Sequence, residues 1–199
     1  DIVAKAIDKV KAAHTVFDTA LTIDPHATVG EALMLLPKRA HQVVVVVDES
    51  GAPIGTVSEA DLTGLDRFNQ VHEAMSSDLT LVSPDATPTE VFDELSAHRH
   101  RAALAVADGQ LVGLMTIKGA LRAALYTPAL DASGRLKIGV AVGISGDVEA
   151  RVDALLEAGA DVLVMDTAHG HQERMISAVE RCRSVVEASD RRVPIVAGN

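Results

Sequence analysis

The segment "DVLVMDTAHGHQ", residues 161–172, places an acid, a hydroxyl and two histidines directly after an apolar run. Carboxylates and imidazoles at the end of a buried strand can transfer protons or bind a metal ion. His169 and His171 have a spacing that can bind zinc from a strand, but zinc needs a third protein ligand and none follows nearby in the sequence. We therefore expect no metal site, and we favour a cofactor-facing loop over a plain strand-to-helix turn.

Two other stretches carry weaker chemical signals. The loop "GISGD", residues 143–147, could hold a phosphate, but single glycines after a strand are also ordinary turn residues, and Asp147 most simply caps the next helix. Cys182 is the only cysteine, which excludes an internal disulfide. Its neighbours "AVERCRSVVEAS" have helical apolar spacing, so we expect a buried structural cysteine rather than a nucleophile.

The composition limits the class of protein. The chain has 199 residues, of which 48% are apolar, enough for one large domain or two smaller ones. Its apolar runs, such as residues 43–47, are far shorter than the roughly 20 residues that cross a bilayer, so we expect a cytoplasmic protein. A net charge of −10 and the scarcity of aromatic residues make nucleic acid an unfavoured partner. The first residue is Asp1 rather than Met, which leaves open that the chain belongs to a longer protein.

An internal repeat organises the first two thirds of the chain. The segment at 21–36 returns at 79–95, and the segment at 51–62 returns at 108–121, in each case about 60 residues later. Each copy predicts the order β-α-β-β-α, which is marginal alone but adequate when two copies pair across a shared face.

Local signals set the elements within each copy. Thr28 and Thr87 are predicted to cap a helix, and Glu31 and Glu90 three residues later can complete a capping box. A β-branched run and then a hairpin turn follow, with turns predicted at 49–51 in the first copy and at 108–109 in the second.

The pattern changes from about residue 129. Apolar strands alternate with amphipathic helices, which predicts a parallel sheet covered by helices and part of a barrel. The expected elements are a strand at 135–143, a helix at 147–160, a strand at 161–166, a helix at 171–189 and a strand at 193–199. The amphipathic segment 1–13 has no obvious partner nearby in sequence and could be the preceding helix of the same barrel.

These residues carry a family resemblance over the whole chain. The repeats resemble tandem CBS domains, the Bateman module that binds purine nucleotides, and "YTPALDASGRLKIGVAVGISGDV", "AGADVLVMDTAHGH" and "IVAGN" resemble the barrel of the IMP dehydrogenase and GMP reductase family. The implied fold is α/β, a partial TIM (β/α)8 barrel with an inserted tandem CBS module. The implied domains are a barrel helix at 1–13, CBS domains at 14–73 and 74–128, and a barrel segment of three strands and two helices at 129–199.

The resemblance also implies roles for strand-end residues, where barrel enzymes place their chemistry. Asp166 would face the nicotinamide ribose or carboxamide of the cofactor, beside Thr167 and Ala168, and Asn199 would position the purine adduct. Gly170 would let the backbone approach the ligand. The two residues expected to line the adenosine edge, with a plain loop as the equal alternative, are Ile144 and Ser145.

The family's catalytic cysteine loop, its mobile flap and its phosphate-binding strand ends do not occur within residues 1–199. We therefore expect no catalytic residue in this chain and no activity from this chain alone. The segments "RAALYTPALDASGRLKIGVAVGISGDV" and "AHGHQ" resemble an actinobacterial GMP reductase group more than IMP dehydrogenase. The cofactor is expected to be NADP or NAD.

The resemblance predicts nucleotide sites in the repeats. CBS domains hold a ribose with a hydroxyl and an acid three positions later, which Ser58 and Asp61 provide in the first copy. In the second copy Thr116 is present but Gly119 replaces the acid, so we expect one typical and one weakened site. Phosphates near a chain of net charge −10 need local cations, although basic residues also suit helix ends. Two clusters at equivalent positions could supply them: Lys38, Arg39, His41, His98, Arg99, His100 and Arg101.

Three functions follow from this interpretation. The first is a segment of a purine nucleotide oxidoreductase whose CBS domains sense ATP or GTP, in a protein that assembles as a tetramer or, through the CBS domains, an octamer. The second is a non-catalytic nucleotide-sensing and assembly module. The third is an oligomerisation scaffold, which predicts no nucleotide binding.

Overall fold

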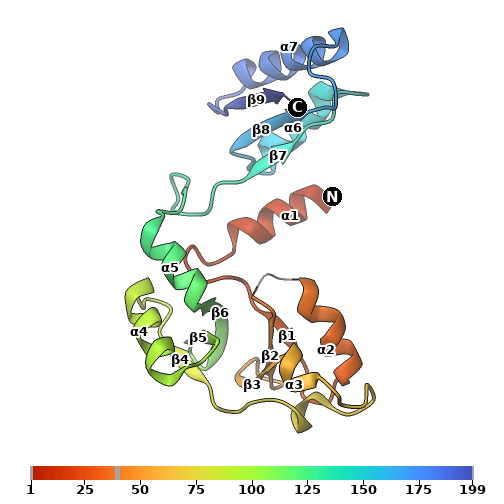
Figure 1. The fold of residues 1–199 in the computed structure, drawn as a ribbon. Helices are drawn as coiled ribbons and strands as arrows, with labels where there is room; N and C mark the ends of the chain where they lie inside the picture. Colours follow the sequence, from red (N-terminus) through yellow and green to blue (C-terminus); the bar gives the residue numbers. More distant parts are fainter. Residues whose placement is uncertain (1, 39–40, 199) are drawn as a thin grey trace. The chain divides into compact units, whose positions relative to one another are not determined.

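The structure is a computed structural model that describes residues 2–38 and 41–198. Its internal contacts divide the chain into two compact units (Figure 1). The terminal unit combines residues 1–13 with residues 129–199, and the central unit contains residues 14–128. Within the described part of the chain, no helix is both long and apolar enough to cross a membrane.

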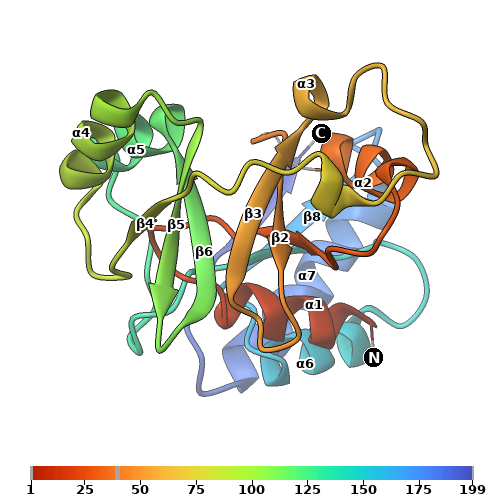
Figure 2. The ribbon, with the colours of Figure 1, turned by 90° about the horizontal axis from the view of Figure 1, so that it is seen from below.

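The central unit contains two sheets of the same topology (Figures 1 and 2). In each sheet the first strand is parallel to the middle strand, and the middle strand is antiparallel to the third. The strands in chain order are β1 (Leu21–Ile23), β2 (Val43–Val47), β3 (Pro53–Ser58), β4 (Thr80–Val82), β5 (Ala102–Ala107) and β6 (Gln110–Thr116). The predicted repeat is therefore a repeat of structure as well as of sequence.

Each sheet has its own helices (Figure 2). Those of the central unit are α2 (Val29–Leu35), η1 (Leu36–Lys38), α3 (Glu59–Leu62), η2 (Val71–Glu73), α4 (Pro88–His98) and α5 (Ile117–Leu125). Both predicted capping boxes are confirmed: Thr28 exchanges hydrogen bonds with Glu31, and Thr87 does so with Glu90. These bonds satisfy N–H groups that the first turn of a helix leaves free.

Both predicted hairpin turns are confirmed as well. Asp108 and Gly109 have φ angles of 50° and 80°, the left-handed pair that suits a two-residue hairpin. In the first copy the Asp48 carboxylate accepts hydrogen bonds from the Ser50 hydroxyl and the Ala52 amide, which lowers the pKa of Asp48.

The two sheets share one apolar cluster in which the buried side chains are Val43, Val45, Leu104 and Leu114. The segment that precedes β1 is hydrogen-bonded to β6: the amide and carbonyl of Asp18 both pair with Leu114, at 2.9 Å. Gly113 is required beside this pair, since a Cβ there would stand 2.9 Å from the Asp18 carbonyl oxygen and from Phe17 Cβ.

The terminal unit is a three-stranded parallel sheet in the order β7-β8-β9 with helices packed against it. Its elements are α1 (Ile2–Lys11), β7 (Gly139–Ala141), α6 (Val148–Glu157), β8 (Val162–Asp166), α7 (Glu173–Ala188) and β9 (Ile195–Gly198). The alternation of strand and helix from residue 139 onward is as the sequence predicts.

The strand expected at 135–143 is wrong in extent. Residues 129–137 form a hairpin loop, in which Leu130 bridges Leu136 and the Lys137 amide donates to the Ala129 carbonyl. The Asp131 carboxylate holds this loop by accepting hydrogen bonds from the amides of Ser133 and Arg135. The strand therefore begins only at Gly139, because the Arg135 carbonyl and the Lys137 amide are paired within the loop and the Ile138 amide bonds the Asp161 side chain.

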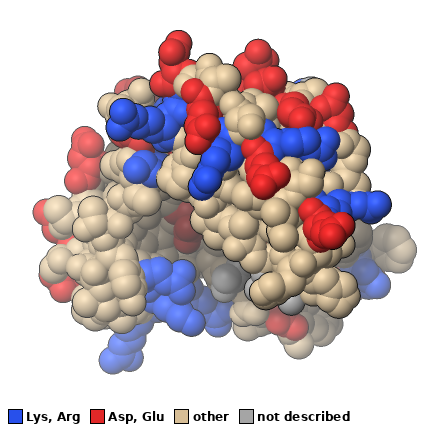
Figure 3. All heavy atoms as spheres, turned by 90° about the horizontal axis from the view of Figure 1, so that it is seen from above, with Lys and Arg blue, Asp and Glu red and all other residues tan. Residues whose placement is uncertain are grey.

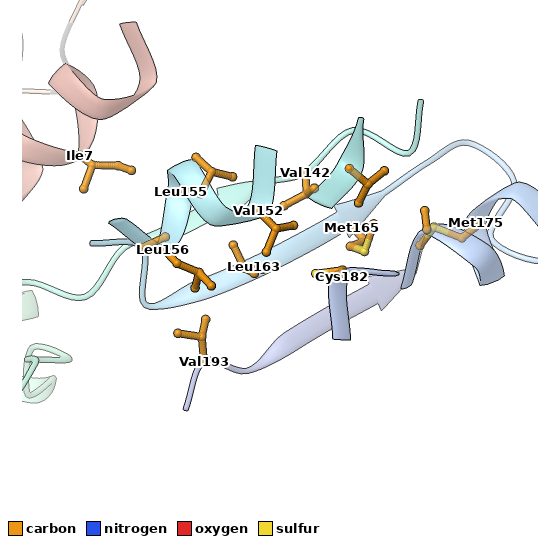
Figure 4. Close-up of a cluster of buried hydrophobic side chains, with 13 residues drawn as sticks. Ile7, Val142, Val152, Leu155, Leu156, Leu163, Met165, Met175, Cys182 and Val193 are labelled. Atoms are coloured by element: carbon orange, nitrogen blue, oxygen red, sulfur yellow. The ribbon is translucent and has the colours of Figure 1, made fainter. Parts of the chain in front are cut away.

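The core of the terminal unit includes a side chain of the first helix, α1 (Figure 4). Ile7 of α1 is buried in the same cluster as Leu155, Leu163 and Val193, which belong to residues 129–199. Cys182 is fully buried in this cluster, and burial raises the pKa of its thiol. The expectation of a structural cysteine is confirmed.

A buried ion cluster also holds α1. Lys11 Nζ lies 2.9 Å from Asp131 Oδ2 and bonds Asp161, with side-chain exposures of 6% for the lysine and 12% for each acid. Asp161 also accepts a hydrogen bond from the Ile138 amide at 2.8 Å, just before β7. The cluster therefore joins α1 to the loop that precedes β7 and to the residue that precedes β8.

The outer surface of α7 carries both signs of charge. Arg181 pairs with Glu149 of α6 at 3.4 Å, and Arg183 lies 4.0 Å from Glu187 on α7 itself. Seen from the end at which α7 lies in Figure 1, basic and acidic side chains are interspersed (Figure 3).

Candidate functional site

The carboxyl ends of β7, β8 and β9 lie at one edge of the terminal sheet, because the three strands are parallel. Asp166 is exposed at the end of β8 and stands in register with Gly198 of β9. The Thr167 amide lies 3.4 Å from the Gly198 carbonyl oxygen, which it bonds. This edge is the candidate ligand site of the terminal unit.

The segment after β8 is held by Gln172, a residue that is not among those predicted from the sequence. Its side-chain amide donates to Thr167 Oγ1 at 3.1 Å, and Gln172 also occupies the N-cap position of α7. Its position just before a helix start was the available signal. The bond closes residues 167–172 into a short loop.

A pocket of about 750 Å³ lies against this loop, the first turns of α7 and the end of β9. Met175, Ile176 and Val179 give it an apolar wall. Of the described residues expected to contact a cofactor, Ala168 and Gly170 line this pocket, and the others lie outside it: Asp166, Thr167, Ile144 and Ser145. His169 and His171 line it too, but among the described residues no group of three or more potential ligands could hold a metal ion.

The loop after β7 lies at the same edge. Ile144 packs against the core of the terminal unit, whereas Ser145 is exposed. Asp147 accepts a hydrogen bond from the Ala150 amide at 3.0 Å, which confirms it as the cap of α6. Arg151 of α6 donates to the carbonyl oxygens of Gly143 and Ser145. The predicted residues Asn199 and Arg39 lie outside the described residues.

The central unit contains a second site, formed by both repeats. The amide and hydroxyl of Ser58 donate to Asp61 Oδ2 at 2.8 and 2.6 Å, and Arg101 of the second repeat donates to Ser58 Oγ at 2.5 Å. Ser58 is buried, and Asp61 is exposed to solvent. The predicted hydroxyl and acid are therefore joined to a guanidinium that can bind an anion in a bidentate manner.

Two pockets open on this group. One of about 200 Å³ is lined by Ser58 and Asp61 together with Arg99, His100 and Arg101. The other, of about 420 Å³, is lined by His41, Ser58 and Arg101 among others. Residues from both predicted basic clusters thus meet the predicted ribose-binding pair.

A left-handed residue directs the second cluster toward the pocket. Arg99 has a φ angle of 57° and ends α4, so the chain turns there before β5. His100 is held on both ring nitrogens, with Nδ1 2.6 Å from Thr80 Oγ1 and Nε2 3.2 Å from Asp78 Oδ2. Thr80 and Asp78 are not predictable from the sequence, because nothing local marks them as partners of a histidine 20 and 22 residues away.

Three predicted residues are not brought to these pockets. Lys38 is exposed at the end of η1, and His98 lies on the exposed end of α4, 3.5 Å from the Glu94 carboxylate. Thr116 accepts a hydrogen bond from the Gly119 amide at 3.1 Å, as a plain helix cap does. Gly119 offers no carboxylate at the position that Asp61 occupies in the first repeat.

The chain is similar to known proteins over nearly its whole length. Residues 2–199 match the family described as "IMP dehydrogenase / GMP reductase domain". The GMP reductase of Mycobacterium tuberculosis is 45% identical over 198 residues, which are 99% of this chain and 40% of that protein. The inosine-5'-monophosphate dehydrogenase of Aquifex aeolicus is 34% identical over 203 residues, covering 98% of this chain and 41% of that protein.

Solved structures give the same relation. A crystal structure of Trypanosoma brucei GMP reductase in complex with guanosine 5'-triphosphate is 30% identical with a TM-score of 0.64, over 98% of this chain and 49% of that one. A variant of the same enzyme in complex with guanosine 5'-monophosphate has a TM-score of 0.64 at 29% identity, over 98% of this chain and 43% of that one. The chain spans about two fifths of the length of the curated relatives above. This chain belongs to the IMP dehydrogenase / GMP reductase family.

Proposed function

We propose that the protein is a purine nucleotide oxidoreductase, and that it is a GMP reductase in preference to an IMP dehydrogenase. The observation that carries the proposal is the family match over residues 2–199. The preference for the reductase rests on sequence identity, which is 45% with the M. tuberculosis GMP reductase and 34% with the A. aeolicus dehydrogenase. The reaction converts GMP and NADPH, with two protons, to IMP, NADP⁺ and ammonium. The dehydrogenase alternative converts IMP, NAD⁺ and water to XMP, NADH and a proton.

The terminal unit supplies the cofactor side of this reaction. Its strand-end edge suits a dinucleotide, because Gly170 and Gly198 expose backbone beside a pocket of about 750 Å³. In the proposal, the nicotinamide cofactor supplies hydride transfer, and this chain binds and orients it through Asp166, Thr167, Ala168 and Gly170, with Ile144 and Ser145 at the adenosine end. Asn199 positions the purine. The apolar wall of the pocket excludes water from the bound ring.

The central unit, in the same proposal, is a CBS module that binds ATP or GTP and regulates the enzyme. The support is the group formed by Ser58, Asp61 and Arg101, in which one repeat offers a hydroxyl and an acid and the other offers a cation. A ribose diol binds a carboxylate and a hydroxyl, and the guanidinium binds phosphate. The protein assembles into tetramers, and the CBS modules pair these into octamers.

The activity is tested on the full-length protein by following NADPH absorbance with GMP, and NAD⁺ reduction with IMP. GMP-dependent oxidation of NADPH, with IMP formed, is the expected result. If only the IMP-dependent reduction of NAD⁺ is observed, the dehydrogenase assignment replaces the reductase. The absence of both activities would refute the oxidoreductase proposal.

The nucleotide site is tested by calorimetry with ATP and GTP. We expect Asp61→Ala and Arg101→Ala each to weaken binding by about tenfold or more, because they remove the ribose and phosphate contacts from different repeats. Asp93→Ala, which changes an exposed acid on α4, is the matched control. Unchanged affinity in both site variants would place the nucleotide elsewhere, and no binding by the wild type would favour a scaffold.

A further inference from the structure

One exposed side chain bridges two carbonyls of the loop after β7. Arg151 Nη1 donates to the Gly143 carbonyl oxygen at 2.8 Å and to the Ser145 carbonyl oxygen at 3.1 Å. Gly143 lies two residues after the end of β7 and Ser145 lies further along the loop, so a single guanidinium nitrogen fixes the spacing of two loop carbonyls. Without it, both carbonyls would need water as their partner.

Two glycines of this loop, Gly143 and Gly146, lie beside the Arg151 guanidinium. The place of a Cβ on Gly143 is 3.5 Å from Arg151 Nη1, and that on Gly146 is 3.6 Å from Nη2. Gly146 has a φ angle of 78°, a left-handed conformation in which other residues are strained. Both glycines therefore lie within van der Waals distance of the guanidinium.

Arg151 is solvent-exposed and belongs to a capped helix. Arg151 lies in the first turns of α6, after the cap formed by Asp147, and Glu149 in the same turn pairs with Arg181 of α7. Across residues 2–38 and 41–198, none of the ion pairs includes Arg151. The hydrogen bonds of its guanidinium therefore go to two backbone carbonyls, at the edge where an anionic dinucleotide would bind.

We propose that Arg151 is a positioning residue for the adenosine half of the dinucleotide, acting by fixing the loop that presents Ile144 and Ser145. The inference rests on the proposed function of this edge, but it names a residue that need not touch the ligand. A dinucleotide gains affinity when the loop is held in one conformation before binding, because less ordering is left to the binding step.

The experiment uses the full-length protein with GMP and NADPH. We expect Arg151→Met to raise the KM for NADPH by about tenfold while kcat at saturating NADPH and the KM for GMP stay within about twofold. Arg151→Lys keeps a donor that reaches one carbonyl and should give an intermediate KM. NADPH affinity, measured directly by quenching of its fluorescence, should follow the same order. Arg183→Met, which removes an exposed arginine of α7, is the control.

A second variant guards against a folding artefact. Gly146→Ala leaves Arg151 in place but strains the loop at a left-handed position, so it should also raise the KM for NADPH selectively. A Cys182 that stays unlabelled by a thiol reagent in each variant, read by mass spectrometry of its own peptide, certifies that the terminal unit is folded. An unchanged NADPH KM in folded Arg151→Met and Gly146→Ala would overturn the inference and leave the proposed function standing. A wild type that binds neither NADPH nor NADH would overturn both.

Discussion

Replacing Lys11 by methionine tests how strongly the N-terminal helix is tied to residues 129–199. The change keeps the apolar stem of the side chain but removes the cation that Asp131 and Asp161 share. With exposures of 6% and 12%, these side chains are buried enough for their charges to be poorly hydrated. Removing one partner of a buried ion pair costs about 3–5 kcal/mol.

We place the expected loss at the lower end, about 3 kcal/mol, because two other cations remain near the acids. Arg135 Nε is 3.2 Å from Asp131, and Arg191 Nη2 is 4.0 Å from Asp161. Both arginines are more exposed than Lys11 and can compensate the acids only in part.

The sequence provides separate reporters for the two units. Cys182, the only cysteine, is buried in the terminal unit, and Tyr126, the only tyrosine, lies in the central unit. Thiol labelling in urea therefore follows the terminal unit. The anisotropy of tyrosine fluorescence follows the central unit, because the exposed Tyr126 at the end of α5 gains rotational freedom when that helix unfolds. We expect Lys11→Met to lower the urea midpoint of thiol exposure by more than about 1 M and to leave the tyrosine transition unchanged.

Arg183→Met is the matched control, because its partner Glu187 lies 4.0 Å away and both side chains are about 70% exposed. Exposed ion pairs contribute little to stability. A midpoint for Lys11→Met equal to that of the control would refute a stabilising role for the buried cluster. An equal shift of the tyrosine transition would refute its assignment to the terminal unit.

Two further predictions concern pH and the second repeat. Burial disfavours the charges of Asp161 and Lys11, but their hydrogen bonds outweigh it, so the pKa of Asp161 falls below its ordinary 3.8 and that of Lys11 rises above 10.5. The stabilisation from Asp161 is present above pH 3.8 and is lost as the pH falls further, and that from Lys11 is present below pH 10.5 and is lost above it. We expect the difference in stability between wild type and Lys11→Met, measured by urea unfolding followed by circular dichroism, to be largest at pH 7 and smaller at pH 3 and pH 11. A difference that does not change with pH would contradict this. Gly119→Asp should create a second nucleotide site, since its Cβ would stand 3.4 Å from Thr116 Oγ1 and its carboxylate could bond that hydroxyl as Asp61 bonds Ser58. Calorimetry should then give a higher ATP or GTP stoichiometry than the wild type, and an unchanged stoichiometry would refute the equivalence of the two positions.

The sequence alone predicted the features that depend on neighbours along the chain. The Thr28–Glu31 and Thr87–Glu90 boxes join residues three positions apart, and the Asp108–Gly109 turn needs only its own φ angles, so residue type suffices. The repeat and the strand–helix alternation were visible because apolar periodicity records which face each element buries.

Long-range partners decided the rest. Lys11 meets Asp131 and Asp161 across separations of 120 and 150 residues, and Arg101 meets Ser58 across 43. The extent of β7 was misjudged for a related reason, because the Asp131 loop takes the backbone groups that the strand would have used.

The sequence by itself determined the elements, their order and the residue types available for binding. Only the tertiary structure decided which of them meet: it joined Ser58 and Asp61 to Arg101, left Lys38 and His98 at the surface, and bonded Arg151 to two carbonyls of the loop after β7. The physical reason is that a local pattern fixes backbone conformation and the buried face, whereas a polar contact between distant residues depends on how the chain folds back on itself.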